Sequence, residues 1–176
     1  GWQPGIATVS QAARVLFDVP DPYNQRIVID KGQLNEVALG SPVIDAGGVV
    51  GQVTRVFPLT AEVTLLTDRD QSIPVLNSRT GARNVASGDI LGGVPHIELK
   101  FVPASADVKE GDLLTTSGID SVYPAGLQVA RISQIERRVD ISFARIHATP
   151  LAEIKGRHVL VLQPTGRGVP AKNKTQ

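Results

Sequence analysis

The chain has 176 residues, which allows one domain or two small ones, and its 18 basic residues nearly balance its 17 acidic ones. This balance, together with an aromatic share of only 4%, excludes a basic, aromatic-rich surface, so we expect no nucleic-acid partner. The chain has no cysteine, which excludes disulfides and thiolate metal sites, and nothing in the composition calls for a cofactor.

Short strands are predicted along the whole chain, with almost no helix between them. They are runs rich in Val, Ile and Leu, bounded by Gly, Pro, Asn or Asp, and the only helical turn is predicted within residues 33–39. No apolar run approaches the ~20 residues that cross a bilayer. Strands at this spacing predict an all-β sandwich or barrel. The predicted strands are Ile6–Val9, Arg14–Val19, Arg26–Asp30, Pro42–Ile44, Val49–Phe57, Glu62–Thr67, Ile73–Leu76, His96–Val102, Asp112–Thr115, Gln128–Ile135, Val139–Ala148 and His158–Leu162.

One pattern of valine and glycine occurs twice. Each copy has a valine, a glycine three residues later, a second glycine seven residues after that, and a strand of the form Q-V-T/A-R-V/I, with a further valine seven residues on. Duplicated strand sets predict a scaffold built from two similar units. The copies comprise Val37, Gly40, Gly47, residues 52–56 and Val63, and Val108, Gly111, Gly118, residues 128–132 and Val139.

The duplication predicts two small β-barrels, over residues 1–90 and 91–163, joined near Gly88–Pro95. Residues 164–176 are polar and aperiodic, so we predict a flexible tail there. Glycine reaches positive φ at little steric cost, and several glycines are therefore predicted to form structural turns. These are Gly40, Gly47, Gly51, Gly111, Gly118 and Gly126.

The residues for catalysis are poorly arranged in the sequence. Ser117, followed by a glycine, is a candidate nucleophile with His96 or His147 as base, as in a divergent two-barrel serine hydrolase. The chain has no G-x-S-x-G or G-D-S-G motif, and all its histidines lie in the second half. We therefore interpret T-S-G as a tight turn and predict that the chain is not an enzyme, with the hydrolase kept as an alternative.

Metal binding is also not predicted. The segment that starts at Asp68 and Asp70 begins like a calcium loop, but Ile73 and Arg79 stand where that loop needs glycine and glutamate. We expect these aspartates to cap the turn after the preceding strand instead.

Short motifs over about residues 26–135 resemble, in the right order, the extracytoplasmic domain of the rod shape-determining protein MreC family. Two turns depart from the family pattern: Glu36 replaces a usual glycine, and the segment 121–124, S-V-Y-P, replaces Gly-x-Phe-Pro. The motifs are D-K-G at 30–32, V-A-L-G-S-P-V-I-D at 37–45, G-V-V-G-Q-V at 48–53, V-T-L-L-T-D at 63–68, S-I-P-V at 72–75, R-T-G-A-R at 79–83, V-P at 102–103, D-V-K-E-G-D at 107–112, T-S-G at 116–118 and P-A-G-L-Q-V at 124–129.

The resemblance implies two β-barrels and a non-catalytic scaffold that organises peptidoglycan synthesis during cell elongation. It implies as partners the elongation transpeptidase, its glycosyltransferase companion, the membrane protein MreD, indirectly the actin-like MreB, and further copies of the chain in a homodimer or larger assembly. It also implies the periplasmic domain of a single-pass inner-membrane protein. Because the chain has no methionine, we expect a fragment or processed product whose membrane anchor lies in a preceding N-terminal part.

Partner binding by such a scaffold depends on exposed apolar anchors. Four side chains are predicted as anchors because they fall at turns or strand ends: Tyr23, Val49, Phe57 and Tyr123. A further alternative is a peptidoglycan-binding module that uses Arg and Tyr side chains.

Overall fold

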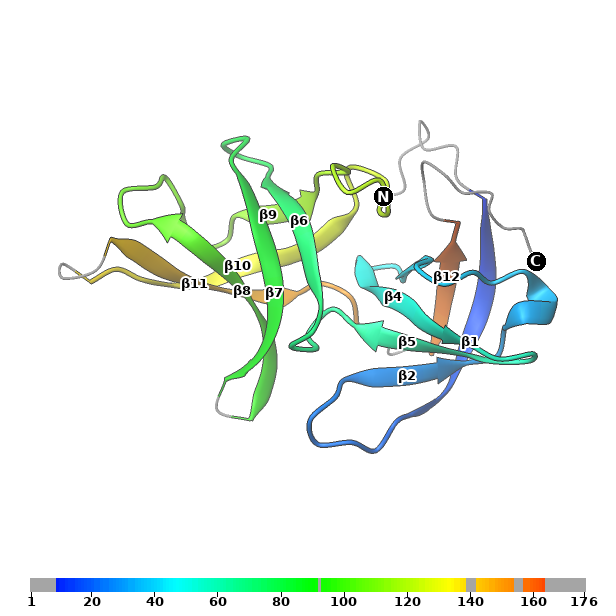
Figure 1. The fold of residues 1–176 in the computed structure, drawn as a ribbon. Coiled ribbons are helices and arrows are strands. Elements are labelled where there is room, and N and C mark those ends of the chain that lie inside the picture. The colour runs from blue at the N-terminus through cyan, green and yellow to red at the C-terminus, as the bar shows by residue number, and fades with distance from the viewer. Residues whose placement is uncertain (1–8, 92, 139–141, 154–156, 164–176) are drawn as a thin grey trace.

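Two closed β-barrels of six strands each make up the computed structural model (Figure 1). It describes residues 9–91, 93–138, 142–153 and 157–163, and within these ranges it contains twelve strands and one 3-10 helix. The all-β prediction of two barrels is confirmed. Within the same ranges, no helix has the length and apolar character needed to span a bilayer.

The first barrel has the strand order β1-β12-β3-β4-β5-β2, and all neighbouring strands are antiparallel. Alternating aliphatic side chains fill its interior, among them Ile27, Val43 and Val63, which are fully buried. The 3-10 helix η1 (Gln33–Asn35) precedes β3, inside the predicted helical turn. The strands are β1 (Ser10–Asp18), β2 (Arg26–Ile29), β3 (Pro42–Ile44), β4 (Val49–Val56), β5 (Ala61–Leu65) and β12 (His158–Leu162).

The second barrel has the order β10-β11-β8-β7-β6-β9, again antiparallel throughout. Its core contains Ile73, Ile97, Leu114 and Ile146, which are fully buried. The strands are β6 (Ser72–Asn77), β7 (Arg83–Leu91), β8 (Val94–Pro103), β9 (Leu113–Thr116), β10 (Gln128–Glu136) and β11 (Phe143–Pro150).

The strand pairing divides the chain differently from the predicted ranges 1–90 and 91–163. Strands β6 and β7 belong to the second barrel, and β12 belongs to the first, where it lies between β1 and β3. The physical reason is barrel closure, because β1 to β5 alone would leave the edges of β1 and β3 unpaired. The predicted tail 164–176 and most of the predicted strand 6–9 fall outside the described residues.

The predicted domain junction at 88–95 is instead a hairpin between β7 and β8, in which Leu91 pairs with Val94. Strand β7 is absent from the sequence prediction. Gly88, interpreted as a linker residue, lies within β7, where a Cβ would sit 2.2 Å from the Asp68 carbonyl oxygen. Asp68 caps its turn as predicted, since its carboxylate accepts hydrogen bonds from the backbone N–H groups of Asp70 and Gln25 at 2.8 Å.

The two barrels repeat one topology. Strands β3, β4, β5, β2 and β1 occur in the same order around the first barrel as β9, β10, β11, β8 and β7 around the second, and β12 and β6 take the sixth place. The N–H of Gly40 donates to Val53 and that of Gly111 to Ile132, at 2.9 and 2.7 Å. The predicted duplication is therefore present in the strand pairing.

The repeated Q-V-x-R letters, however, are out of register by three residues. Pro42 lies two residues after Gly40 and pairs with Gln52. Leu113 lies two residues after Gly111 and pairs with Arg131, so Gln52 matches Arg131 and not Gln128. Val53 therefore corresponds to Ile132 and not to Val129. Residue 139 lies outside the described residues, and the partner of Ile132 on β11 is Ala148.

The barrels meet at the turn between β3 and β4. Ile44, Val49 and Leu66 of the first barrel share one buried cluster with the core of the second. Gly47 is placed so that a Cβ would lie 2.1 Å from the Leu151 carbonyl oxygen, and one at Gly48 would lie 2.4 Å from that of Gln128. Glycine at this turn therefore permits the close approach of the barrels.

The other predicted turn glycines divide into two groups. The prediction of a turn at Gly51 is wrong, since this residue lies inside β4, where a Cβ would sit 2.1 Å from the Thr64 carbonyl oxygen. The remaining ones have positive φ, as the prediction requires: Gly40, Gly111, Gly118 and Gly126.

Candidate interaction surfaces

Two of the four predicted anchors are exposed and two are not. Tyr23 is 79% exposed in the loop between β1 and β2, and Phe57 is exposed at the end of β4. Val49 and Tyr123 are buried in the cluster that spans the second barrel and the junction, so their prediction as exposed anchors is corrected. Each follows a turn, but the turn directs its side chain inward. Burial also raises the pKa of the Tyr123 phenol.

Leu34, Phe57 and Leu59 form an exposed apolar patch at the end of the first barrel, which we term the first-barrel patch. Backbone hydrogen bonds bring its parts together, from Gln33 N–H to the Phe57 carbonyl at 2.8 Å and from Leu34 N–H to the Pro58 carbonyl at 3.0 Å. Helix η1 is thereby held on the turn between β4 and β5. This turn points away from the second barrel (Figure 1).

Phe101 and Phe143 form a second exposed patch, the second-barrel patch. Their rings pack edge to face with centroids 5.8 Å apart, and Phe101 is 77% exposed. Phe101 has φ +59°, in the left-handed region that bulky side chains rarely occupy. Such strain persists only where the surrounding structure imposes it, and it concentrates at functional sites.

The second-barrel patch lies at the opposite end of the molecule from the first-barrel patch. The end of β8 and the start of β11 are on the side of the second barrel away from the junction (Figure 1). Positive side chains flank the rings, since Lys100 is exposed beside Phe101 and Arg145 follows Phe143 on the same outer face. Arg145 Nε also contacts Glu98 Oε2 at 3.5 Å.

Sequence reasoning missed Phe101, Phe143, Leu34 and Leu59 as surface residues. For Phe143 a signal was present, because alternation along the strand puts it on the face of Arg145, and a charged residue marks the outer face. For Leu34 the sequence gives no such signal, since its exposure depends on how η1 packs on the distant β4–β5 turn.

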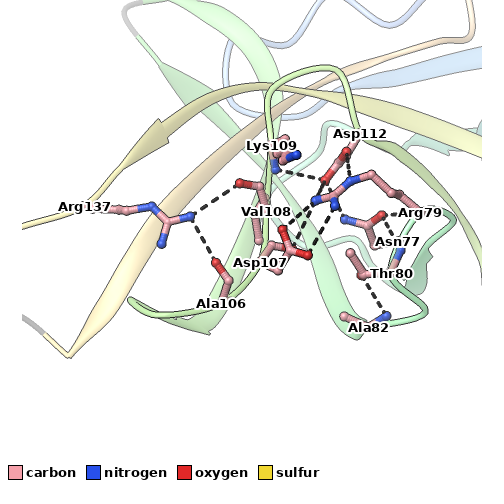
Figure 2. Close-up of polar contacts among 10 residues, drawn as sticks. All are labelled: Asn77, Arg79, Thr80, Ala82, Ala106, Asp107, Val108, Lys109, Asp112 and Arg137. Carbon is pink, nitrogen blue, oxygen red and sulfur yellow. Dashed lines mark hydrogen bonds and ion pairs between the residues drawn. The ribbon is translucent and has the colours of Figure 1, made fainter.

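A polar network holds the turn between β6 and β7 to the segment before β9 (Figure 2). Arg79 binds Asp112 with two hydrogen bonds of 2.8 and 3.0 Å and also contacts Asp107 at 3.0 Å. Asn77 and the Lys109 N–H add two more bonds to Asp112, both at 2.9 Å. The hydrogen bonds from the Arg79 guanidinium hold the pKa of Asp112 well below its usual range. These residues account for the R-T-G-A-R and D-V-K-E-G-D motifs in structural terms.

The candidate hydrolase residues are not brought together. His96 and His147 bond to each other, while the Ser117 hydroxyl accepts a hydrogen bond from Ile119 N–H at 3.4 Å. Across the described residues, no hydrogen bond joins Ser117 to either histidine.

A groove of about 460 Å³ lies between the barrels on the side of β1 and β12. Its walls are mostly small or aliphatic and include Ala12, Leu160, Ala46 and Leu127, and His158 also lines it. The groove shows that the barrels touch along only part of their facing sides.

The sequence of this chain matches one protein family and several known relatives. Residues 15–163 match the family described as rod shape-determining protein MreC, barrel core. The cell shape-determining protein MreC of Haemophilus influenzae is 41% identical over 154 residues, and that of Escherichia coli K12 is 37% identical over 149. These matches cover 87% and 85% of this chain but only 43% and 40% of the relatives, so the chain spans less than half of their length.

Solved structures agree. The crystal structure of MreC from Pseudomonas aeruginosa superposes with a TM-score of 0.82 at 42% identity, covering 87% of this chain and 98% of that one. Two more distant structures, at 20% and 15% identity, share the fold, with TM-scores of 0.75 and 0.65. One is described as the major periplasmic domain from the cell shape-determining filament MreC, covering 91% of this chain and 98% of its own. The other is a complex between penicillin-binding protein PBP2 and MreC from Helicobacter pylori, covering 90% and 99%.

Proposed function

The chain belongs to the MreC family of rod shape-determining proteins, and on this premise we propose that it is the periplasmic part of a non-catalytic scaffold for cell elongation. In this role it binds the elongation transpeptidase and further copies of itself, and so sets where peptidoglycan is made. The other partners implied by the resemblance, the glycosyltransferase, MreD and MreB, belong to the same proposal and act with the longer protein.

The observation that carries this proposal is the pair of apolar patches at opposite ends of a two-barrel body. A scaffold needs separate surfaces for separate partners, and closed barrels offer no strand edges for pairing. Side chains must then supply the contacts, and aromatic anchors dominate such interfaces. The Helicobacter pylori complex of PBP2 with MreC supports a transpeptidase as one partner.

We assign the transpeptidase to the second-barrel patch. Its two rings and the strained Phe101 have the composition of a binding hot spot, and Lys100 and Arg145 suit an acidic rim on the partner. The first-barrel patch is aliphatic apart from Phe57 and is assigned to contacts between copies.

Binding to the periplasmic part of the transpeptidase, followed by interferometry, tests this proposal. We expect saturable binding in the micromolar range, roughly 8 kcal/mol at 1 μM. The double variant Phe101→Ser with Phe143→Ser is expected to weaken it at least ~30-fold. The matched variant Leu34→Ser with Leu59→Ser should leave it within about twofold and reduce self-association in sedimentation.

All four side chains are exposed, so both variants should keep the thermal unfolding midpoint of the unmodified chain. No binding up to ~100 μM would contradict the transpeptidase proposal. Equal losses from both variants would contradict the assignment of separate ends.

A further inference from the structure

His96 on β8 and His147 on β11 meet between neighbouring strands of the second barrel. His96 Nε2 and His147 Nδ1 are 3.0 Å apart, and the ring centroids are 5.0 Å apart at an interplanar angle of 43°. The two residues are only 8% and 3% exposed. Neither belongs to the patches or to the Arg79 network, so this buried pair has no role in the functions proposed above.

The neighbours of the pair determine which nitrogens carry hydrogen. Glu136 Oε2 lies 3.2 Å from His147 Nε2, and because a carboxylate only accepts, Nε2 of His147 carries a hydrogen. Nδ1 of the neutral His147 is then an acceptor, and Nε2 of His96 must donate to it. Nδ1 of His96 is left as a bare lone pair that is buried and has no hydrogen-bond partner within the described part of the chain.

From this geometry we infer that His96, His147 and Glu136 form an acid-sensitive lock, which ties β8 to β11 and opens when both histidines are protonated. Only one hydrogen fits between two nitrogens 3.0 Å apart, so the closed pair binds one proton at most. A second proton makes both rings donors on the facing side, and the contact must break.

Charged groups on every strand next to the pair act on this equilibrium. Asp89 on β7 pairs with His96 in the strand register, Glu98 on β8 pairs with His147, and Glu136 lies on β10. These three carboxylates are the acidic groups that face the pair. Arg145 on β11 contacts Glu98 and adds a positive charge to this set.

The lock lies on the strand that leads to the junction of the barrels. Leu151, four residues after His147, donates its N–H to the Val129 carbonyl at 3.1 Å, and its own carbonyl lies against Gly47. The Glu153 N–H donates to Asp45 Oδ2 at 2.8 Å. β11 runs toward the first barrel (Figure 1), so opening the lock should loosen the junction.

The sign of the pH dependence follows from proton counting. In acid the unfolded chain binds protons on both histidines, whereas the closed pair binds one at most. The unfolding equilibrium constant should therefore rise as the pH falls through the range in which histidine titrates, by up to about tenfold per pH unit for the excluded proton.

Nitrogen NMR of the unmodified chain between pH 7.5 and 4.5 tests the lock, with the exposed His158 on β12 as internal control. At pH 7.5 we expect hydrogen on Nε2 of both rings and none on Nδ1. On acidification, the pair should take up its second proton only as the ring contact is lost, and the protection factor of the Leu151 amide should fall at least tenfold.

Urea unfolding over the same pH range separates the lock from general acid effects. His147→Gln should flatten the pH dependence of unfolding, and His158→Gln should leave it unchanged. The inference would be overturned if both paired histidines took up a proton while their ring contact persisted, or if Leu151 kept its protection. Since the NMR test uses the unmodified chain, it remains decisive if His147→Gln fails to fold.

Discussion

The two barrels share one topology but obtain their sixth strand in different ways. The second barrel takes β6 from the residues directly before its other strands, so residues 72–150 contain all of it. The first takes β12 from beyond the second barrel, where Ser10 pairs with Leu162. One barrel is thus local in sequence and the other is closed by its two distant ends, which predicts different responses to the same kind of damage.

Removing β12 should have the largest effect. A chain that ends at Glu153 should lose the protected amides of β1 to β5, because β1 and β3 lose their shared neighbour. The amides of β6 to β11 that lie away from the shared buried cluster should keep their native chemical shifts and exchange protection. Loss of both barrels together would contradict the independence of the second.

Gly47→Ala should be the most damaging single substitution at the junction of the barrels. Its Cβ would meet the Leu151 carbonyl oxygen at 2.1 Å and force the barrels apart, at a cost of about 3 kcal/mol. At Gly118, at the matching place in the repeat, the nearest atom to an added Cβ is the Ala125 Cβ at 3.0 Å, and φ is +78°, so Gly118→Ala should cost about 1 kcal/mol. Urea unfolding measures the free energy of unfolding of both variants. Equal losses would show that contact between the barrels does not account for the effect of Gly47→Ala.

The position after the first repeat glycine distinguishes the barrels chemically, with Ser41 in one and Asp112 in the other. Asp112→Ala should destabilise by about 2 kcal/mol, since it leaves Asn77 and Arg79 without their shared carboxylate partner. Ser41→Ala should change the free energy of unfolding by less than about 1 kcal/mol. Urea unfolding of the two variants measures the difference, and equal losses would contradict a special role for the Asp112 carboxylate.

The contact between Asp112 and Arg79 also predicts how the stability of the chain depends on pH. The pKa of Asp112 is lowered in the folded chain, so its stabilisation is fully present above its unfolded value of about 3.9 and is lost as the pH falls below it. Asp112→Asn should flatten acid unfolding below about pH 4. An unchanged acid limb would show that other carboxylates control it.

Glu36→Gly should have the smallest effect, with the opposite sign. Glu36 has φ +64° and Ser121 has φ +60°, and both stand where the resemblance to the MreC family predicts glycine. Glycine removes the backbone strain of the folded chain, and the freedom that it adds to the unfolded chain offsets part of this gain. Each replacement should therefore raise the free energy of unfolding by up to ~1 kcal/mol. A lower unfolding midpoint for either variant would show that the native side chain makes a compensating contact.

Much of this architecture is predictable from local patterns, and the rest depends on distant contacts. Alternation and turn glycines predict the all-β class, the duplication and most strands, because those signals act over a few residues. The register of the repeat is not predictable from Q-V-x-R letters, since the connection from Gly111 to Ile132 is longer than the one from Gly40 to Val53, while the bulges at Val50 and Val129 lie at matching places in both barrels. Neither is the place of β12, because His158–Leu162 fits either barrel as an apolar strand.

Among the residues of the candidate surfaces, too, local patterns predict some exposures, and distant contacts determine the others. Tyr23 and Phe57 are exposed as local reasoning predicts, whereas Val49 is buried because the other barrel covers it. Phe101 is exposed through a backbone conformation that no sequence pattern of phenylalanine predicts.

The nested strand order also has a consequence for biosynthesis. As the chain emerges from the ribosome, the segment that completes the second barrel ends at Pro150, while the first barrel still waits for Leu162. The N-terminal strands are made first and closed last, with the edges of β1 and β3 open in the interval. Synthesis from the N-terminus therefore presents an incomplete barrel first, and the yield of the native protein should depend on whether chaperones protect those two edges.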